Sequence, residues 1–131
     1  MPRTITLRFP WFPRELSPNV ARRLHWAAKA KAAKAYRELC GWEARLQHPV
    51  QLHLGSTMFN SLVLATTTFH VKDKIRRDFR NLDAALKPLW DGIVDAGILQ
   101  DDSTEHLRHA ESKLVVGKEK YIEVTLTEEE G

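Results

Sequence analysis

The sequence predicts an α+β fold, a mixed β-sheet packed with two main helices in a single domain spanning residues 1–131. Three observations lead to this prediction. The chain has 131 residues, about the length of one domain. Hydrophobic residues make up 43% and charged residues 28%, which is ordinary for a globular protein. Hydrophobic patterns of strand and helix period follow one another in the order β, α, β, β, α, β, β, which is typical of two helices laid on one sheet.

The first half of the chain predicts a strand, a loop, a long helix and two more strands. Residues 4–9 (TITLRF) alternate polar and apolar side chains, as a half-buried strand does. Residues 10–19 contain three prolines and predict a loop. Residues 20–46 are rich in alanine and contain no proline, which favours a helix. Its apolar positions at helical spacing are Leu24, Ala28, Ala32, Tyr36 and Leu39. Residues 50–54 and 62–71 are rich in residues that favour strands.

The second half predicts a helix and a closing hairpin. Residues 80–95 carry an apolar stripe at the spacing of a helix. The stripe consists of Leu82, Leu86, Leu89 and Ile93. Pro88 lies inside this helix, where it removes a hydrogen bond and should kink the chain. Gly97 is a natural stop at its C-terminal end. Residues 106–116 and 121–128, joined by GKEK, predict a hairpin that completes the sheet.

Composition also bears on where the protein works. The single cysteine, Cys40, excludes an intramolecular disulfide and fits a reducing compartment. No apolar run approaches the length of a membrane span, and the first residues lack the apolar core of a signal peptide. We therefore expect a cytoplasmic protein without a membrane partner.

Charge is distributed unevenly along the chain. Residues 1–40 contain nine Lys or Arg and two acids, a net charge of +7, whereas the rest of the chain carries −4 of the total of +3. A basic N-terminal part followed by an acidic remainder of the chain indicates a polyanion partner together with an acidic site. The alternative is a soluble protein whose surface charge is simply uneven.

Six aspartates lie within residues 76–103, together with one lysine and three arginines. The aspartates are Asp78, Asp83, Asp91, Asp95, Asp101 and Asp102. Charged residues at intervals of four, from Asp83 through Lys87 to Asp95, would line one face of the predicted helix. Salt bridges on a solvated face explain this spacing, and capping of a helix start explains Asp78.

A metal site explains the same residues in a different way. Carboxylates gathered in a fold repel one another unless a cation neutralises them. Mg²⁺ prefers carboxylate oxygens and retained waters, and it offsets charge on a phosphoryl oxygen. A lysine such as Lys87 stabilises the same charge, and arginines on the rim hold backbone phosphates. The stretch therefore predicts an acidic metal site beside a phosphate-binding rim.

Four segments carry a resemblance to a known family. They are SPN at 17–19, HVKDKIRRD at 70–78, LKPLWDGIVDAGILQDD at 86–102 and GKEKYIEVTLTE at 117–128. Over most of the chain, their combination resembles the RusA family of Holliday junction resolvases, which are small phage and prophage endonucleases. The combined pattern is more specific than any one segment.

The resemblance implies a RusA-like fold and a homodimeric, Mg²⁺-dependent endodeoxyribonuclease, with Mn²⁺ as a substitute ion. Such an enzyme nicks paired strands of four-way DNA junctions in recombination and repair, in the cytoplasm of a bacterium or of a phage-infected host. Matched residue by residue, Asp78 corresponds to the first aspartate of the family's Asp-x-Asp-Asn motif. Lys87 corresponds to the family's lysine, Asp91 to its helix aspartate and Asp102 to its later aspartate.

The chain departs from the family's motif at Arg80, which stands where a second aspartate is expected. The motif here reads Asp-Phe-Arg-Asn, and the span from Asp78 to Lys87 is three residues longer than in short family members. Asp83 lies about one helical turn, or roughly 4.5 Å of rise, beyond Arg80. We therefore expect Asp83 to supply the carboxylate that Arg80 does not.

The sequence thus predicts a set of site residues for each role. The predicted catalytic residues are Asp78, Asp83, Lys87 and Asp102, of which the three aspartates bind the metal. The predicted DNA contacts are Lys74, Arg76, Arg77, Arg80, Arg22, Arg23 and Lys29. Two alternatives stay open, a catalytically impaired protein that binds DNA junctions and a general nucleic-acid-binding regulator that uses only the basic helix.

Overall fold

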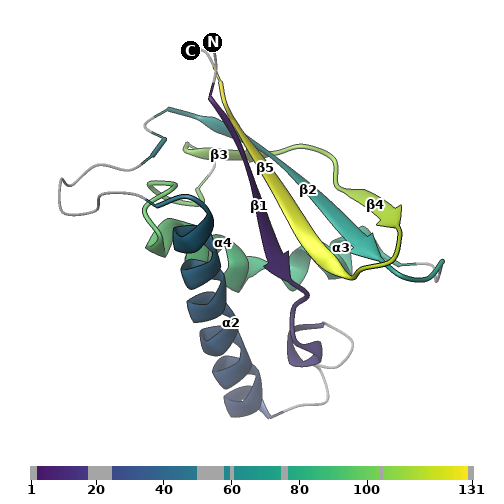
Figure 1. Ribbon diagram of the computed structural model, residues 1–131. Coiled ribbons are helices and arrows are strands. Elements are labelled where there is room, and N and C mark those ends of the chain that lie inside the picture. Colours follow the sequence, from purple (N-terminus) through teal and green to yellow (C-terminus); the bar gives the residue numbers. More distant parts are fainter. Residues whose placement is uncertain are drawn as a thin grey trace.

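The computed structural model describes residues 3–17, 25–49, 58–59, 61–74, 77–103 and 105–129. In chain order the elements are β1 (Thr4–Pro10), the 3-10 helix η1 (Arg14–Leu16), α2 (Trp26–Gln47), β2 (Val63–Val71), α3 (Phe79–Ala84), α4 (Lys87–Asp95), β3 (Leu107–His109), β4 (Lys113–Val116) and β5 (Tyr121–Glu128). They form a mixed five-stranded sheet packed with helices in a single compact domain (Figure 1), which confirms the predicted α+β class. The strand predicted at 50–54 lies outside the described residues.

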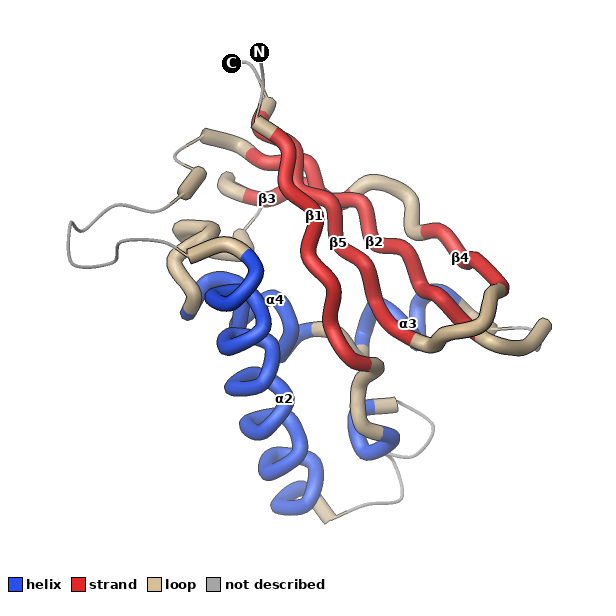
Figure 2. Tube along the Cα trace, in the orientation of Figure 1, coloured by secondary structure: helices blue, strands red, loops and turns tan. Residues whose placement is uncertain are grey.

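The sheet has the order β1-β5-β2, with β3 and β4 both paired to the far edge of β2 (Figure 2). β5 runs antiparallel to β1 and to β2, whereas β3 and β4 run parallel to β2. The predicted hairpin is therefore wrong, because β5 does not pair with the strand that precedes it. β5 buries every second side chain and takes a central position, whereas all four residues of β4 are exposed, as at an edge.

One face of the sheet forms the core. β1, β2 and β5 bury alternate side chains, including Leu7, Phe69 and Val124. In Figure 1, α3 and α4 lie behind the sheet, and α2 packs against α4 and β1. The opposite face carries threonines that pair across strands, such as Thr6 with Thr125. The period-two pattern of the sequence therefore describes a sheet with one covered face.

Helix α2 buries only part of the predicted stripe. Its buried residues are Tyr36, Cys40, Gly41 and Ala44. Of the predicted stripe, Ala28 is exposed, Leu39 is 43% exposed and Leu24 lies outside the described residues. Tyr36 is buried as predicted and Ala32 packs half-buried against the core, but Ala28 and Leu39 were predicted wrongly. The helix surface is mostly alanine, which contrasts little in hydrophobicity. The face that meets α4 is instead chosen by small residues that let the two helices approach closely.

The predicted helix at 80–95 is two helices. Its apolar stripe is buried as expected, but the chain breaks between Ala84 and Lys87. Pro88 lies in the first turn of α4 rather than inside a helix, and there its missing N–H costs nothing. Gly97 ends α4 with a φ of 81°, and the N–H of Ile98 donates to the carbonyl of Ile93 at 3.3 Å. This closure confirms the predicted glycine stop.

No helix within the described ranges is both long enough and apolar enough to span a lipid bilayer.

Candidate functional site

A pocket of about 670 Å³ opens beside the interruption between β3 and β4. Three of the predicted catalytic residues, Asp83, Lys87 and Asp102, line it together. They come from α3, the start of α4 and the loop after α4, so the fold gathers them from separate segments. Phe79 and Trp90 contribute apolar wall.

The pocket exists because the chain leaves the sheet after β3 and returns at β4. Ala110 still donates its N–H to the carbonyl of Ala65 at 2.8 Å, and pairing with β2 resumes at Lys113. Between these points the Ser112 hydroxyl donates to Asp83 Oδ1 at 3.0 Å. This bond ties the carboxylate of α3 to the sheet edge and orients it at the pocket wall.

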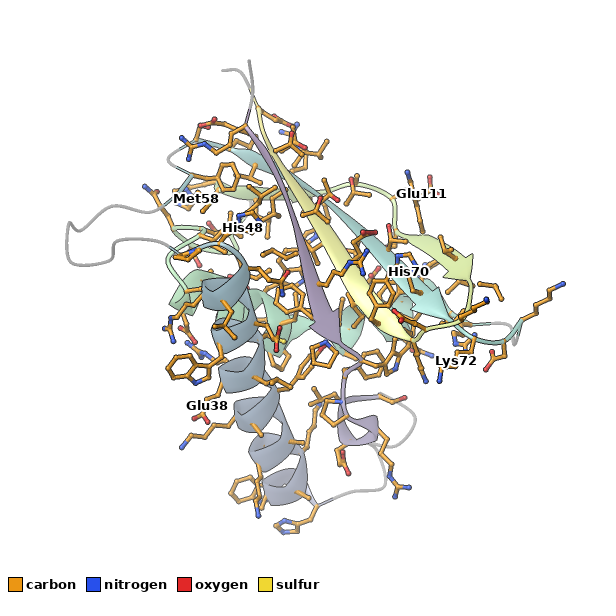
Figure 3. The ribbon with its side chains drawn as sticks, viewed as in Figure 1. Glu38, His48, Met58, His70, Lys72 and Glu111 are labelled. Atoms are coloured by element: carbon orange, nitrogen blue, oxygen red, sulfur yellow. The ribbon has the colours of Figure 1, made fainter. Side chains whose placement is uncertain are left out.

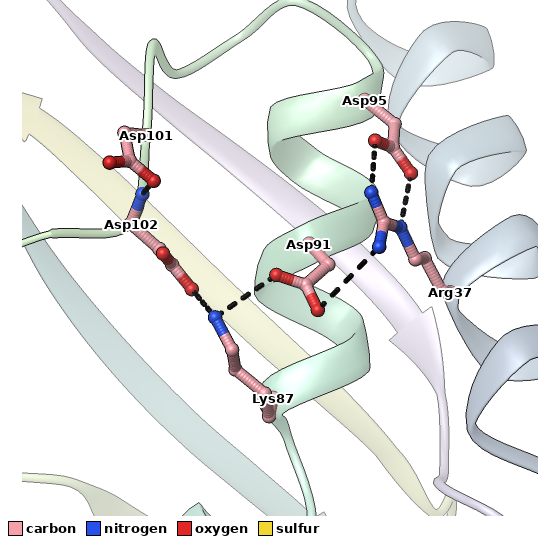
Figure 4. A network of polar contacts seen from close by, with 6 residues as sticks. All are labelled: Arg37, Lys87, Asp91, Asp95, Asp101 and Asp102. Carbon is pink, nitrogen blue, oxygen red and sulfur yellow. Dashed lines mark hydrogen bonds and ion pairs between the residues drawn. The ribbon is translucent and has the colours of Figure 1, made fainter. Parts of the chain in front are cut away.

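Lys87 lies between two carboxylates at the entrance to α4 (Figure 4). Its ammonium donates to Asp102 Oδ2 and lies 3.1 Å from Asp91 Oδ1. The bond to Asp102, followed by the one to Asp91, raises the pKa of Lys87 above its ordinary value. The same lysine lowers the pKa of Asp102, whose backbone N–H donates to Asp101 Oδ1 at 2.8 Å. At neutral pH the pair is therefore ionised on both sides.

Asp95 is engaged on the other side of α4 (Figure 4). The Arg37 guanidinium donates to its two oxygens at 2.7 and 2.8 Å, and the same guanidinium lies 4.0 Å from Asp91. This bidentate bond lowers the pKa of Asp95. The charged residues from Asp83 to Asp95 therefore do not line one face of one helix, as predicted. Asp83 belongs to α3, and Asp95 faces α2.

The fourth predicted catalytic residue, Asp78, lines a neighbouring hollow with Arg77, Phe79 and Arg80. Its side chain caps α3 by accepting from the N–H of Arg80 at 2.9 Å. Phe79 contributes to both the hollow and the pocket, so its ring lies between them. The structure brings Asp83, Lys87 and Asp102 together in one pocket. Asp78 lines the neighbouring hollow instead.

The donor chemistry of the pocket fits a hard cation. Asp83, Asp102 and Glu111 all offer carboxylate oxygens, which Mg²⁺ prefers. Among the residues that the structure describes, no three acidic, His or Cys side chains gather closely enough to hold a metal by themselves. Mg²⁺ is often held by only one or two carboxylates, with waters and substrate phosphates completing the shell. A site of this open kind is the one that the pocket could form.

The predicted DNA contacts differ in how available they are. Lys29, Lys74 and Arg80 are exposed. Arg77 pairs with Asp73 at 2.8 Å, and its side chain is only 16% exposed, so it is less available to a partner than these three. Three further predicted contacts, Arg22, Arg23 and Arg76, lie outside the described residues.

Sequence reasoning missed several residues of the pocket wall, among them His109, Glu111 and Ser112 on the segment from β3 to β4. His109 packs edge-on against Trp90, with ring centroids 4.8 Å apart. These residues were predicted to lie within one strand. The signal that could have found them is the loss of period-two alternation over residues 109–112, which marks an interruption in a strand.

Comparison with known proteins identifies no family for this chain. No family model matches it, and no curated protein matches it. The resemblance to the RusA family therefore rests on the sequence motifs alone and stays a prediction.

Proposed function

We propose that the chain is a divalent-metal-dependent endodeoxyribonuclease that cuts branched DNA such as four-way junctions. One observation carries the proposal: Asp83, Lys87 and Asp102, from three separate segments, line one open pocket. An acid pair with an adjacent ammonium is the combination that phosphodiester hydrolysis needs, since negative charge develops on the phosphate. The exposed Lys74 and Arg80 lie close by in sequence and would hold backbone phosphates.

Each pocket residue has a role under this proposal. Asp102 and Asp83 would hold Mg²⁺ or Mn²⁺, which supplies Lewis-acid stabilisation of a phosphoryl oxygen when bound. The Ser112 hydroxyl keeps Asp83 turned toward the pocket. Lys87 is 65% exposed, so its ammonium can turn from Asp102 to a phosphate oxygen and stabilise the charge that develops there.

A homodimer suits the proposed substrate. A four-way junction has strands related by two-fold symmetry, and a two-fold dimer would present one pocket to each. We also assign the activity to the cytoplasm, because a lone buried thiol fits a reducing compartment.

A junction-binding protein without nuclease activity is the second candidate, and the placement of Asp78 favours it. Asp78 lines a different hollow from Asp102 and serves as a helix cap. Arg80 occupies the motif position of an aspartate, and Lys87 already neutralises Asp102. On this reading the site would bind DNA and leave it intact.

Incision of a synthetic four-way junction in Mg²⁺ separates the two candidates. The nuclease proposal expects the wild type to cut, and Asp102→Asn to cut slower by on the order of 100-fold or more. Asp95→Asn is the matched control, because it removes the same charge from α4 at a residue bonded to Arg37 outside the pocket. Asp78→Asn then measures the contribution of the neighbouring hollow.

Binding without incision, left unchanged by Arg80→Asp, would favour the second candidate. Equal loss of incision in Asp102→Asn and Asp95→Asn would count against the pocket as the active site.

A further inference from the structure

A second hollow, of about 570 Å³, lies where β1 ends and β5 begins. Four basic side chains line it, Arg8, Lys72, Lys118 and Lys120, together with Glu43 and Glu119. We call it the β4–β5 hollow, because Lys118 and Lys120 belong to the turn that joins those strands. Figure 3 shows Lys72 near His70 at this end of the sheet. None of the four basic residues is among the predicted DNA contacts.

These four cations gather in one hollow and differ from those basic residues that are paired with a carboxylate. Elsewhere, Arg37, Arg77, Lys87 and Arg108 each form an ion pair with an aspartate or glutamate. Within the described part of the chain, the four cations of the β4–β5 hollow form no such pair. Glu43 and Glu119 line the same hollow without pairing with these cations, so four cations against two acids leave it a net positive charge of two.

Aromatic rings hold two of these cations in place. The Arg8 guanidinium lies 4.9 Å from the centroid of the Tyr121 ring, and Lys120 Nζ lies 4.6 Å from the centroid of the Trp11 ring. Tyr121 is itself stacked on His70, with ring centroids 4.1 Å apart. Contacts between a cation and an aromatic face position the charge without cancelling it. The cations are thus arranged to meet an anion from outside.

We infer that the β4–β5 hollow binds phosphates of a nucleic-acid backbone. A concave site with a net positive charge attracts polyanions, and Arg and Lys are the usual donors to backbone phosphates. The positive charge of the hollow is enough to favour an anionic group such as a phosphate. The further step from phosphate to DNA rests on the proposed function.

β2 and the turn after it contribute a residue to each site. Thr67 lines the catalytic pocket and Lys72 lines the β4–β5 hollow. Five residues of strand span about 16 Å at 3.3 Å per residue. Along one DNA strand, that length corresponds to about five nucleotides at 3.4 Å each. Thr67 is buried on the helix-covered face, whereas Arg8 and Tyr121 belong to the opposite face of the sheet. DNA that contacts both sites would therefore pass around the edge of the sheet, with the hollow acting as an anchor outside the chemistry.

The test measures binding of a fluorescent four-way junction by anisotropy in EDTA, over a series of salt concentrations. Lys118→Gln/Lys120→Gln should lower the slope of log Kd against log salt by about 1.8 and weaken binding roughly tenfold. Lys118→Arg/Lys120→Arg keeps the charge and should bind within about twofold of wild type. Arg45→Gln/Arg108→Gln is the matched control, because it removes two charges that already contact Asp95 and Glu129.

Several outcomes would overturn the inference. Unchanged affinity and slope in the Gln variant would do so, as would an equal loss in the matched control. If inorganic pyrophosphate stabilises the wild type but not the Gln variant, while their DNA affinities agree, the hollow takes a small anion instead. If the lysines control binding but wild type never incises the junction, the inference stands and the nuclease proposal fails.

Discussion

Replacing Gly92 with alanine should destabilise the protein, because α2 passes directly over this residue of α4. An added Cβ would lie 2.7 Å from the Arg37 carbonyl oxygen and 2.8 Å from the Gly41 nitrogen. Both are backbone atoms of α2, so no side chain can rotate to make room. The two helices would have to separate or slide, which changes the packing along their whole contact.

The magnitude follows from two opposing effects. Overpacking of a close contact costs about 1–3 kcal/mol, and two backbone clashes place this site at about 3 kcal/mol. Alanine is a better helix former than glycine by about 1 kcal/mol, which offsets part of the loss. The net loss is about 2 kcal/mol. For a chain of this length the entropy of unfolding is about 0.28 kcal/mol/K, so the melting temperature should fall by about 7 °C.

Gly41→Ala is the matched control, because it places the same methyl on the facing helix. There the added Cβ would lie 3.5 Å from the Gly92 carbonyl oxygen, which is an ordinary contact. Only the gain in helix propensity remains, so we expect a stability change between zero and an increase of about 1 kcal/mol. Thermal unfolding followed by circular dichroism measures both variants. A Gly92→Ala protein as stable as wild type would refute the close approach of α2 and α4.

Two further predictions concern ionisable groups. Lys87 lowers the pKa of Asp102 from its ordinary value of 3.8, so the stability from this pair is present above that value and is lost as pH falls through the lowered pKa. Because Lys87 is largely exposed, Asp102→Asn should cost at most about 1 kcal/mol at pH 7, and the melting temperatures of the two proteins should begin to approach each other near pH 3.8 and coincide below the lowered pKa of Asp102; a constant difference would contradict the ion pair. Burial raises the pKa of Cys40 to about 12, so this thiol should resist alkylation by iodoacetamide at pH 8 until the protein unfolds; rapid labelling of the folded chain, detected by mass spectrometry, would show that α2 does not bury it.

Some elements were predictable because their signal is local. Residues 4–9 and 62–71 alternate in hydrophobicity, and the strands found there differ from the prediction by one residue at one end. Gly97 ends its helix as expected, because a left-handed residue after a helix favours glycine in any context. The buried stripe of residues 82–93 was also correct, since leucine and isoleucine contrast strongly with their charged neighbours.

Other features were not predictable because they depend on a partner. The choice of β2, rather than β4, as the neighbour of β5 depends on which strands are covered by helices. The buried face of α2 depends on where Gly92 lets another helix approach. Pro88 was predicted to kink a single helix, but it lies in the first turn of a separate helix, α4.

The candidate site divides in the same way. The sequence by itself determined which groups are chemically competent, because side-chain type decides whether a residue offers an anion, a cation or an apolar wall. Only the tertiary structure decided which of them meet: Lys87 reaches Asp102 across the turn after α4, and Asp78 remains in the next hollow. The reason is physical, since the distance between two charges depends on how helices and strands pack, and residue spacing along the chain sets that distance only within one element.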